Sequence, residues 1–346
     1  MLVSKRMLVS KGLSGIVFPM LGIILYFAAI SWTPPPIEDR KVIKISFLNV
    51  LTSSLSDKKE NILAFPKYQW KNRQKALIQL IQLDRPAVLG LCELDINQAK
   101  TLEMELEEYI LVGFASETGE SIETTKMRFA HEEHRKYGEF VALLVDKSRI
   151  RIDELKCHIL PSAKKQKWQR IIVEASLYDD WTDTSFVCLA SHFDHIKKSV
   201  HVRKQSAEQE LAILKRLEEE KIPWFSVGDR NWYVNRDEEN ANIYLQEPFI
   251  SDFRDRMELG HFGPSGTFPG YLWLCRFLPP PSQVPTVDTG YRSAYLIEGI
   301  YYYAYTGEFD PVTGNLLPIH PKSEALGERN LLSDHYLFGG AFRFKK

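Results

Sequence analysis

Apolar residues recur along this chain with the two periods that distinguish strands from helices. Residues 42–48 alternate between apolar and polar positions, which predicts a half-buried strand whose inner face continues to Asn49. Residues 70–83 carry apolar side chains at helical spacing, and we expect that helix to end just before Pro86. Residues 115–136 are polar and show no clear period, so they are predicted to form a surface loop.

Several short apolar runs end directly in a polar residue. Three of them are typical of buried strands and lead into Glu93, His192 and Asp229; they cover residues 88–92, 186–190 and 224–228. A helical pattern lies between the second and the third run. Near the end of the chain, Ser333-Asp334-His335 precedes another strand-like segment. Strands that alternate with helices predict an α/β fold, and α/β folds place their sites at strand ends.

One segment near the beginning of the chain has a different character. Residues 12–32 carry no charged side chain and follow a basic segment, residues 1–11. About 20 helical residues span the roughly 30 Å hydrocarbon core of a bilayer, so we expect a single transmembrane anchor here. The basic flank predicts a cytoplasmic N-terminus and a body outside the cytoplasm. The alternative is a cleaved signal peptide, which would make the body a secreted protein.

The remaining chain is predicted to contain one soluble domain. A proline-rich linker, residues 33–41, connects the expected anchor to a body that covers residues 42–346. The whole chain has 346 residues, of which 44% are hydrophobic and 26% are charged. These values are ordinary for globular proteins, and they exclude a wholly disordered or collagen-like chain.

Charge and cysteine content narrow the classes of function. The formal net charge of −1 argues against a protein that holds nucleic acid mainly through a bulk positive field. The four cysteines include no CxxC pair, so the sequence does not predict a structural zinc site. Cys92 and Cys188 lie inside apolar runs and are predicted to be small core residues.

The polar residues at the predicted strand ends suit one kind of chemistry. Carboxylates and carboxamides are oxygen ligands, which Mg²⁺ and Mn²⁺ prefer. Histidines can transfer protons or stabilise charge on an attacked oxyanion. The set therefore predicts metal-assisted hydrolysis of a phosphate ester by in-line attack of water. It consists of Asn49, Glu93, His192, Asp229, Asn231, Asp334 and His335.

These residues stand in motifs that resemble the endonuclease/exonuclease/phosphatase superfamily, the group that includes deoxyribonuclease I. The resemblance spans about residues 42–346, and the motifs occur in the family's order. They are Phe47-Leu48-Asn49-Val50, Leu91-Cys92-Glu93, Glu139-Phe140 through Arg149, Ser191-His192-Phe193-Asp194-His195 with Arg203 and Gln205, Gly228-Asp229-Arg230-Asn231, Gly266-Thr267-Phe268-Pro269-Gly270-Tyr271 and Ser333-Asp334-His335. The resemblance implies a four-layer α/β/β/α sandwich of two packed mixed β-sheets.

The resemblance also implies a role for each matched residue. Glu93 would bind Mg²⁺ or Mn²⁺, with Asn49 and Asp334 as ligands or supports. Asp229 and Asn231 would orient the attacking water and the phosphate. His192 would stabilise charge on the phosphate, and His335 would act as the general base. Asn49, His192 and Asn231 would contact the substrate phosphate.

Three positions depart from the family's pattern. Glu298 stands where the family has an aspartate that partners the last histidine, and Pro269 replaces a histidine. Arg230 stands at a position that is normally apolar. By strand alternation its side chain should point away from Asp229, into a packed region where its charge needs a partner.

These departures leave two classes of function open. The first is a membrane-tethered phosphoesterase that acts on a phosphodiester or phosphomonoester, with a lipid headgroup or a nucleic acid as substrate. The second is a catalytically weak member of the family that serves as a tethered binding or adaptor module. No obligate protein partner is evident in the sequence.

Overall fold

The structure is a computed structural model of the chain. It describes residues 42–53, 57, 69–128, 139–163, 169–196, 198–231 and 243. It also describes the backbone of strand segments at 250–252, 261–262, 298–303, 309–317 and 337–344. In these later strands, Phe342 is the residue whose side chain is described. All of these residues belong to one compact unit, Arg40–Lys346. The predicted anchor, residues 12–32, lies outside the described residues. Among the described helices, none is both long and apolar enough to cross a bilayer.

Two β-sheets form the framework. One sheet consists of β1 (Val42–Asn49), β2 (Val88–Leu94), β3 (Tyr109–Ala115), β4 (Phe140–Asp146), β10 (His261–Phe262), β12 (Phe309–Leu317) and β13 (Leu337–Phe344). The described strands of this sheet lie in the order β10-β12-β13-β1-β2-β4-β3. The strands β1 and β2 are parallel, with Asn49 opposite Cys92, whereas β1 and β13 are antiparallel.

The second sheet contributes the other half of the framework. It consists of β5 (Ile150–Leu160), β6 (Arg170–Asp179), β7 (Thr184–His192), β8 (Trp224–Asp229), β9 (Ile250–Asp252) and β11 (Glu298–Tyr303). Its described strands lie in the order β5-β6-β7-β8-β11-β9. The strands β7 and β8 are parallel, with His192 opposite Asp229.

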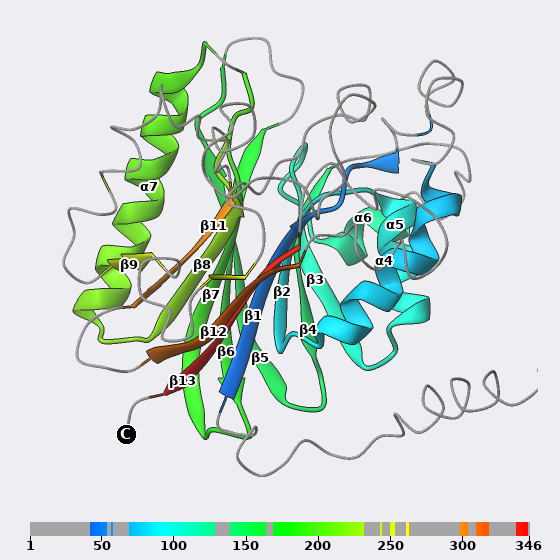
Figure 1. The fold of residues 1–346 in the computed structure, drawn as a ribbon. Coiled ribbons are helices and arrows are strands. Elements are labelled where there is room, and N and C mark those ends of the chain that lie inside the picture. Colours follow the sequence, from blue (N-terminus) through cyan, green and yellow to red (C-terminus); the bar gives the residue numbers. More distant parts are fainter. Residues whose placement is uncertain are drawn as a thin grey trace, which may run out of the picture. The chain divides into compact units, whose positions relative to one another are not determined.

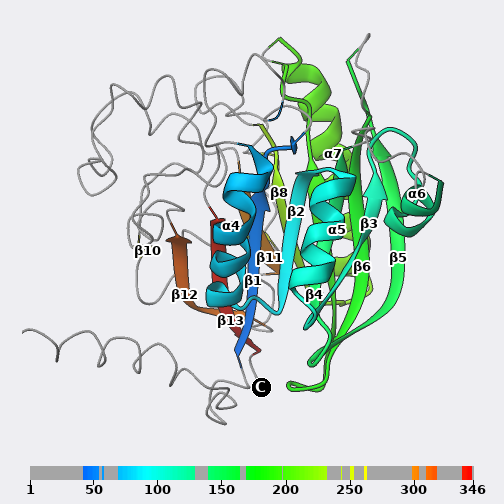
Figure 2. The ribbon, with the colours of Figure 1, turned by 90° about the vertical axis from the view of Figure 1, so that its right-hand side faces the viewer.

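Helices cover the outer faces of both sheets. The helices α4 (Trp70–Asp84), α5 (Ile96–Glu105) and α6 (Ile122–Arg128) lie on the first sheet, and α7 (Val200–Glu219) lies on the second (Figures 1 and 2). The layers therefore follow the order helix, sheet, sheet, helix. This arrangement confirms the predicted four-layer α/β/β/α sandwich.

The strand pattern read from the sequence explains how the two sheets pack. Ile43, Ile45 and Phe47 occupy one face of β1 and lie in the core between the sheets, as the alternation predicts. The sheets lie close together at Gly90, where an added Cβ atom would lie 2.5 Å from Cγ2 of Val227. A larger residue at that position would force the two sheets apart.

Local signals set the ends of two helices. Helix α4 ends at Asp84, and Arg85 adopts a left-handed conformation with φ of 48° immediately before Pro86, so the predicted end is confirmed. Helix α5 begins with a capping box in which Asp95 and Gln98 satisfy each other's backbone N–H groups.

The prediction of a loop for residues 115–136 was wrong in part. Residues 122–128 form helix α6, whose first turn contains Glu123. Ile122 is fully buried in the cluster beneath the helices, so a single apolar anchor stabilises a segment too short to show helical periodicity. The rest of the predicted loop from residue 129 onward lies outside the described residues.

The charge of Arg230 has the buried partner that the sequence required. Arg230 is 1% exposed, and its Nη2 atom donates to Oε1 of Glu210 at 2.8 Å. Its Nε atom lies 3.2 Å from Oε2 of the same carboxylate, and Nη2 also donates to the hydroxyl of Ser226 at 2.7 Å. The pair connects the end of β8 to helix α7, behind the edge where Asp229 lies.

We expect Glu210→Ala to destabilise the fold by about 3–5 kcal/mol, because it leaves the buried guanidinium of Arg230 without its counter-charge. Urea unfolding followed by circular dichroism measures this change. Glu208→Ala removes an exposed carboxylate from the same helix and serves as the matched control. If the two substitutions lower the free energy of unfolding equally, the buried ion pair stabilises the fold no more than the exposed carboxylate does.

Candidate active site

Polar side chains from both sheets meet at the edge of the sandwich where parallel strands end. Asn49 is the last residue of β1, and His192 and Asp229 are the last residues of β7 and β8. The register places His192 opposite Asp229, so both side chains start from the same edge of their sheet. All three residues are at least 99% buried, since their exposed fractions are 0%, 1% and 1%. The sequence predicted this convergence, and the structure brings these three residues together.

Glu93 joins them through a local irregularity of β2. Its φ of 55° lies in the left-handed region, which a non-glycine residue rarely adopts. The pairing of β2 with β4 shifts register between Leu91 and Leu94, so Glu93 lies in a bulge. In a regular strand, Glu93 and Cys92 would point to opposite faces of the sheet. The bulge instead allows both side chains to reach the same site.

The amide of Asn49 connects the two carboxylates. Its Nδ2 atom donates to Oε1 of Glu93 at 3.0 Å and to Oδ2 of Asp229 at 3.0 Å. Its Oδ1 atom accepts a hydrogen bond from the backbone N–H of Leu51 at 3.1 Å, which fixes the orientation of the amide. In this arrangement Asn49 orients the carboxylates through its nitrogen, the supporting role among those that the resemblance implied.

Asn231 holds Asp229 from the other side. Its backbone N–H donates to Oδ1 of Asp229 at 2.9 Å, and its own φ is 51°. Its side-chain Nδ2 atom donates to the carbonyl of Phe193 at 3.1 Å. Both oxygens of Asp229 are therefore positioned by asparagine donors, and the loop after β7 is tied to the end of β8.

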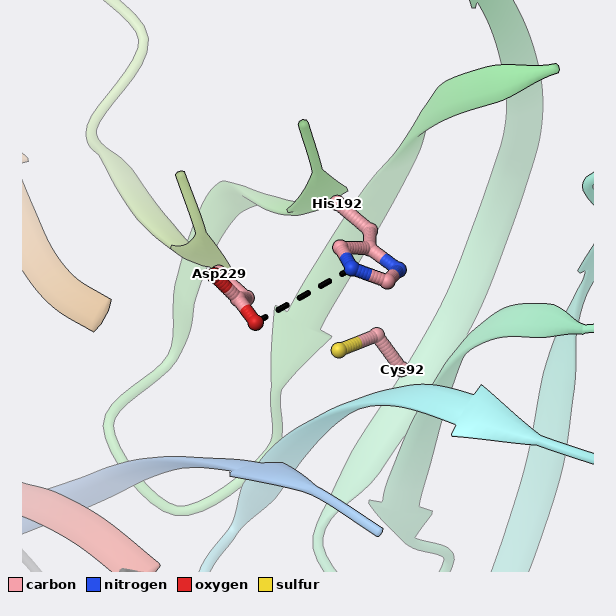
Figure 3. Close-up of side chains that lie close together, drawn as sticks. All are labelled: Cys92, His192 and Asp229. Carbon is pink, nitrogen blue, oxygen red and sulfur yellow. Dashed lines mark ion pairs between the residues drawn. The ribbon is translucent and has the colours of Figure 1, made fainter. Parts of the chain in front are cut away.

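His192 faces both carboxylates. Its Nε2 atom lies 3.9 Å from Oε1 of Glu93 and 3.9 Å from Oδ2 of Asp229. Figure 3 shows the ring beside the carboxylate of Asp229. These distances exceed a direct hydrogen bond.

Arg170 is a site residue that the sequence analysis missed. It opens β6, is 3% exposed, and places Nη1 at 2.7 Å from Nδ1 of His192 and at 3.2 Å from Nε2. The same Nη1 atom donates to Oε2 of Glu139 at 3.0 Å. A charged residue at the start of the apolar run Ile171-Ile172-Val173 was the available signal.

The contact with Arg170 fixes the position of the His192 ring. The Nη1 atom of Arg170 lies within hydrogen-bond distance of both ring nitrogens, at 2.7 and 3.2 Å, and a guanidinium can only donate. The ring is therefore held between Arg170 and the carboxylates of Glu93 and Asp229.

A second histidine lies on the other side of Arg170. Nη2 of Arg170 lies 2.8 Å from Nδ1 of His195. Burial, and then the positive charge of Arg170, lower the pKa of His195 from its ordinary value. The loop that carries this histidine is held by Arg203, whose Nη1 atom donates to the carbonyls of Asp194 and Ile196 at 3.2 and 2.7 Å. Arg203 is fully buried, which explains its place in the sequence motif.

The donor set fits a divalent cation. Two carboxylates accept hydrogen bonds from one amide nitrogen, so two negative charges lie close together in a largely buried place. Such a pair is costly unless a cation compensates it, and oxygen ligands of this kind suit Mg²⁺ or Mn²⁺. Glu93, whose side chain is 21% exposed, and Asp229 are the described residues that could hold the ion.

Cys92 also reaches this site. One ligand atom from each of Cys92, His192 and Asp229 lies within 4.8 Å of the others, and Figure 3 shows the three side chains grouped together. Cys92 is fully buried, as predicted for a core residue, but its sulfur also borders the polar cluster. The apolar run around it concealed this second property.

Other predicted site residues are only partly described. Glu298 is the first residue of β11, and its backbone pairs with Asp229, which places the residue at the same edge of the sheet. Asp334 and His335 lie outside the described residues, as does Pro269. Their predicted roles stay predictions.

Comparison with known proteins identifies the fold. No family model matches the sequence, and no curated protein matches it either. Among solved structures, an endonuclease/exonuclease/phosphatase family protein from Bacteroides thetaiotaomicron superposes with a TM-score of 0.66 at 16% identity, covering 88% of this chain and 98% of that one.

Two further solved structures have the same fold and differ in what their names say they act on. A mannosyl-6-phosphatase of Bacteroides thetaiotaomicron gives a TM-score of 0.63 at 16% identity, covering 87% of this chain and 100% of that one. D. rerio TDP2, in complex with a single-stranded DNA product, gives 0.58 at 17% identity, covering 87% and 99%. The two sheets, their covering helices and these likenesses together identify the fold of this chain as that of the endonuclease/exonuclease/phosphatase superfamily.

Proposed function

We propose that this protein is a divalent-metal-dependent phosphoesterase that hydrolyses its substrate by in-line attack of water. The observation that carries the proposal is the amide of Asn49 holding the carboxylates of Glu93 and Asp229 beside the Nε2 atom of His192. The fold supports it, because solved structures with this fold include a phosphatase and a protein in complex with a DNA product.

The metal would be held by Glu93, with Asp229 beside it. When bound, Mg²⁺ or Mn²⁺ polarises the phosphate and lowers the barrier to attack. Asn49 would keep the two carboxylates at fixed positions. The donor set of oxygen atoms is the observation that supports this assignment.

The remaining residues would act on the phosphate and on water. The Nε2–H of His192 would donate to a phosphate oxygen and stabilise the charge that develops there. Asp229, with both oxygens positioned by Asn49 and Asn231, would orient the attacking water. His335 would act as the general base and Glu298 would orient it, in line with the resemblance.

Arg170 would be a positioning residue for His192. Its contact with both ring nitrogens would hold the ring beside the phosphate. Glu139 in turn accepts from Arg170 and holds the guanidinium in place. The contact would keep the ring in one position before any substrate arrives.

The structure weakens one reason for the alternative, a catalytically weak adaptor. Arg230 forms its pair with Glu210 and Ser226, away from the cluster of Asn49, Glu93 and Asp229. Its presence therefore leaves the polar cluster intact. The substrate class, a phosphomonoester or a phosphodiester of a lipid headgroup or nucleic acid, stays open within the proposal.

We also propose that residues 12–32 tether the enzyme to a membrane. The support is the uncharged length of this segment and its basic N-terminal flank. A tether would favour a substrate at the membrane surface.

We expect Asp229→Asn and His192→Gln each to lower metal-dependent kcat/KM by at least about a hundredfold, the scale of losing one positioned polar group at a reaction centre. The assay uses residues 37–346 with Mg²⁺ or Mn²⁺ on a bis-aryl phosphodiester, an aryl phosphate, plasmid DNA and sphingomyelin. Asp180→Asn and His201→Gln alter exposed residues and are the matched controls. Wild-type rates in the two site variants would contradict the proposal.

We expect His195 to titrate below its ordinary value of 6.5, because burial and Arg170 disfavour its charged form. Below that value the unfolded chain binds a proton that the folded chain excludes, so this group makes the fold less stable as pH falls through this window. Ring resonances in NMR spectra measure the pKa.

Arg170→Gln should raise the pKa of His195 only partly, since burial is the larger cause. Arg151→Gln, which removes an exposed arginine paired with Asp180, should leave it unchanged. A pKa of His195 at or above 6.5 in the wild type would contradict the expected lowering by burial and by Arg170.

The proposed tether predicts that the full chain stays in the membrane fraction after an alkaline wash, whereas residues 37–346 alone are released. Fractionation followed by immunoblotting measures this. Release of the full-length chain would contradict the tether and leave the phosphoesterase proposal untouched.

A further inference from the structure

The thiol of Cys92 belongs to the core and also borders the polar cluster at the edge of the sandwich. Its sulfur, one nitrogen of His192 and one carboxylate oxygen of Asp229 all lie within 4.8 Å of one another, and the three side chains come from three different strands. Figure 3 shows them converging from β2, β7 and β8. All three residues are buried, with exposed fractions of 0% to 1%.

Strand geometry explains how the thiol enters this cluster. Cys92 points to the face of β2 that packs against the second sheet, together with Val88. It pairs in register with Asn49, the last residue of β1, so it stands at the same edge as the polar residues. The thiol therefore lies beneath the cluster, at the point where the apolar core ends.

We propose that Cys92, His192 and Asp229 form a binding site for a thiophilic divalent cation such as Zn²⁺, distinct in ligand chemistry from the Mg²⁺ or Mn²⁺ that the oxygen ligands would hold. Sulfur, imidazole nitrogen and carboxylate oxygen are the three ligand types of Zn²⁺, whereas Mg²⁺ does not use sulfur. Three protein ligands with a fourth position for water or substrate is a common arrangement for this ion.

The spacing is close to what such an ion requires. Zn²⁺ bonds sulfur at about 2.3 Å and nitrogen or oxygen at about 2.0–2.2 Å, so ligand atoms around it lie roughly 3.3–3.7 Å apart. The Nε2 atom of His192 and Oδ2 of Asp229 are already 3.9 Å apart. All separations in the cluster lie within 4.8 Å, so side-chain movements of at most about 1 Å would bring the ligand atoms to these distances. Glu93 Oε1, at 3.9 Å from the same nitrogen, is placed to serve as the fourth ligand.

Binding of the cation would change the contacts of His192. A histidine that binds a metal through Nε2 carries its proton on Nδ1 and usually donates it to a carboxylate. The Nη1 atom of Arg170, 2.7 Å from Nδ1, would have to move aside, and Oε2 of Glu139, now 3.9 Å from Nδ1, would then be the carboxylate that accepts. As the cation binds, the thiol of Cys92 loses its proton to solvent and forms the sulfur–metal bond.

Binding of Zn²⁺ at this site has a consequence for catalysis, and this consequence rests on the proposed function. Zn²⁺ on Nε2 removes the N–H donor that would face the phosphate, and it occupies Asp229, which would orient the water. The thiophilic cation and productive substrate binding are then mutually exclusive. Zn²⁺ would inhibit the enzyme through a residue, Cys92, that takes no part in the proposed hydrolysis.

Cobalt binding tests the site without any measurement of activity. The full chain, stripped of metal with a chelator, is titrated with Co²⁺ and followed by absorption spectroscopy. We expect one Co²⁺ per chain with a thiolate-to-cobalt charge-transfer band in the near ultraviolet, and loss of that band in Cys92→Ala. Cys188→Ala removes another fully buried strand cysteine and should keep the band.

Two results would overturn the site. One is wild-type protein without a charge-transfer band at saturating Co²⁺, and the other is an unchanged band in Cys92→Ala. Circular dichroism establishes that each variant is folded. If Cys92→Ala does not fold, zinc-edge X-ray absorption of the wild-type chain decides: we expect one sulfur per Zn²⁺ at about 2.3 Å, and a shell of nitrogen and oxygen alone would refute the site.

Inhibition by Zn²⁺ tests the consequence separately. In the phosphoesterase assay, we expect half-inhibition of Cys92→Ala to require at least about tenfold more Zn²⁺ than half-inhibition of the wild type. Losing one interaction at a metal site lowers metal affinity by at least about this factor. Absence of hydrolysis with an intact cobalt band would refute the proposed function and retain the cation site. Hydrolysis without a cobalt band would retain the proposed function and refute the cation site.

Discussion

The amide of Asn49, which donates to the carboxylates of both Glu93 and Asp229, is the contact on which the arrangement of the site depends. It spans the two sheets, since Asn49 and Glu93 belong to one and Asp229 to the other. Two buried like charges would repel each other strongly without it. The donor nitrogen orients them, and a cation is the group that can compensate them. The site is therefore organised to receive positive charge where the strands of both sheets end.

Three buried arginines each hold a different part of this fold in place. Arg230 neutralises Glu210 and connects β8 to α7 behind the site. Arg73 donates to the backbone carbonyls of Val50 and Leu51, and so fixes the turn that follows Asn49. Arg170 lies at the site itself and holds the ring of His192. Because a guanidinium is always charged and only donates, each of these contacts fixes the orientation of its acceptor.

The same edge presents two sets of ligands. Oxygen atoms of Glu93 and Asp229 suit a hard cation, whereas the sulfur of Cys92 adds a soft ligand immediately beneath them. The two sets share Asp229 and flank His192, so they cannot both be fully occupied. A bulge of one residue in β2 creates this overlap, because it turns Glu93 toward the face on which Cys92 lies.

The sequence by itself predicted an α/β fold and most of the strand-end residues, whereas the four layers were implied by the resemblance of its motifs to the superfamily. Period-two alternation identified β1, short apolar runs identified β2, β7 and β8, and each run ended in the residue that now lines the site. Such signals depend only on neighbours along the chain, so one sequence suffices to detect them. Tertiary structure decided the contribution of Arg170, Glu139 and Cys92, and the partner of Arg230. Those roles arise where β2, β6, β7 and α7 come together, and pairing between segments far apart in sequence leaves no periodic trace in any one of them.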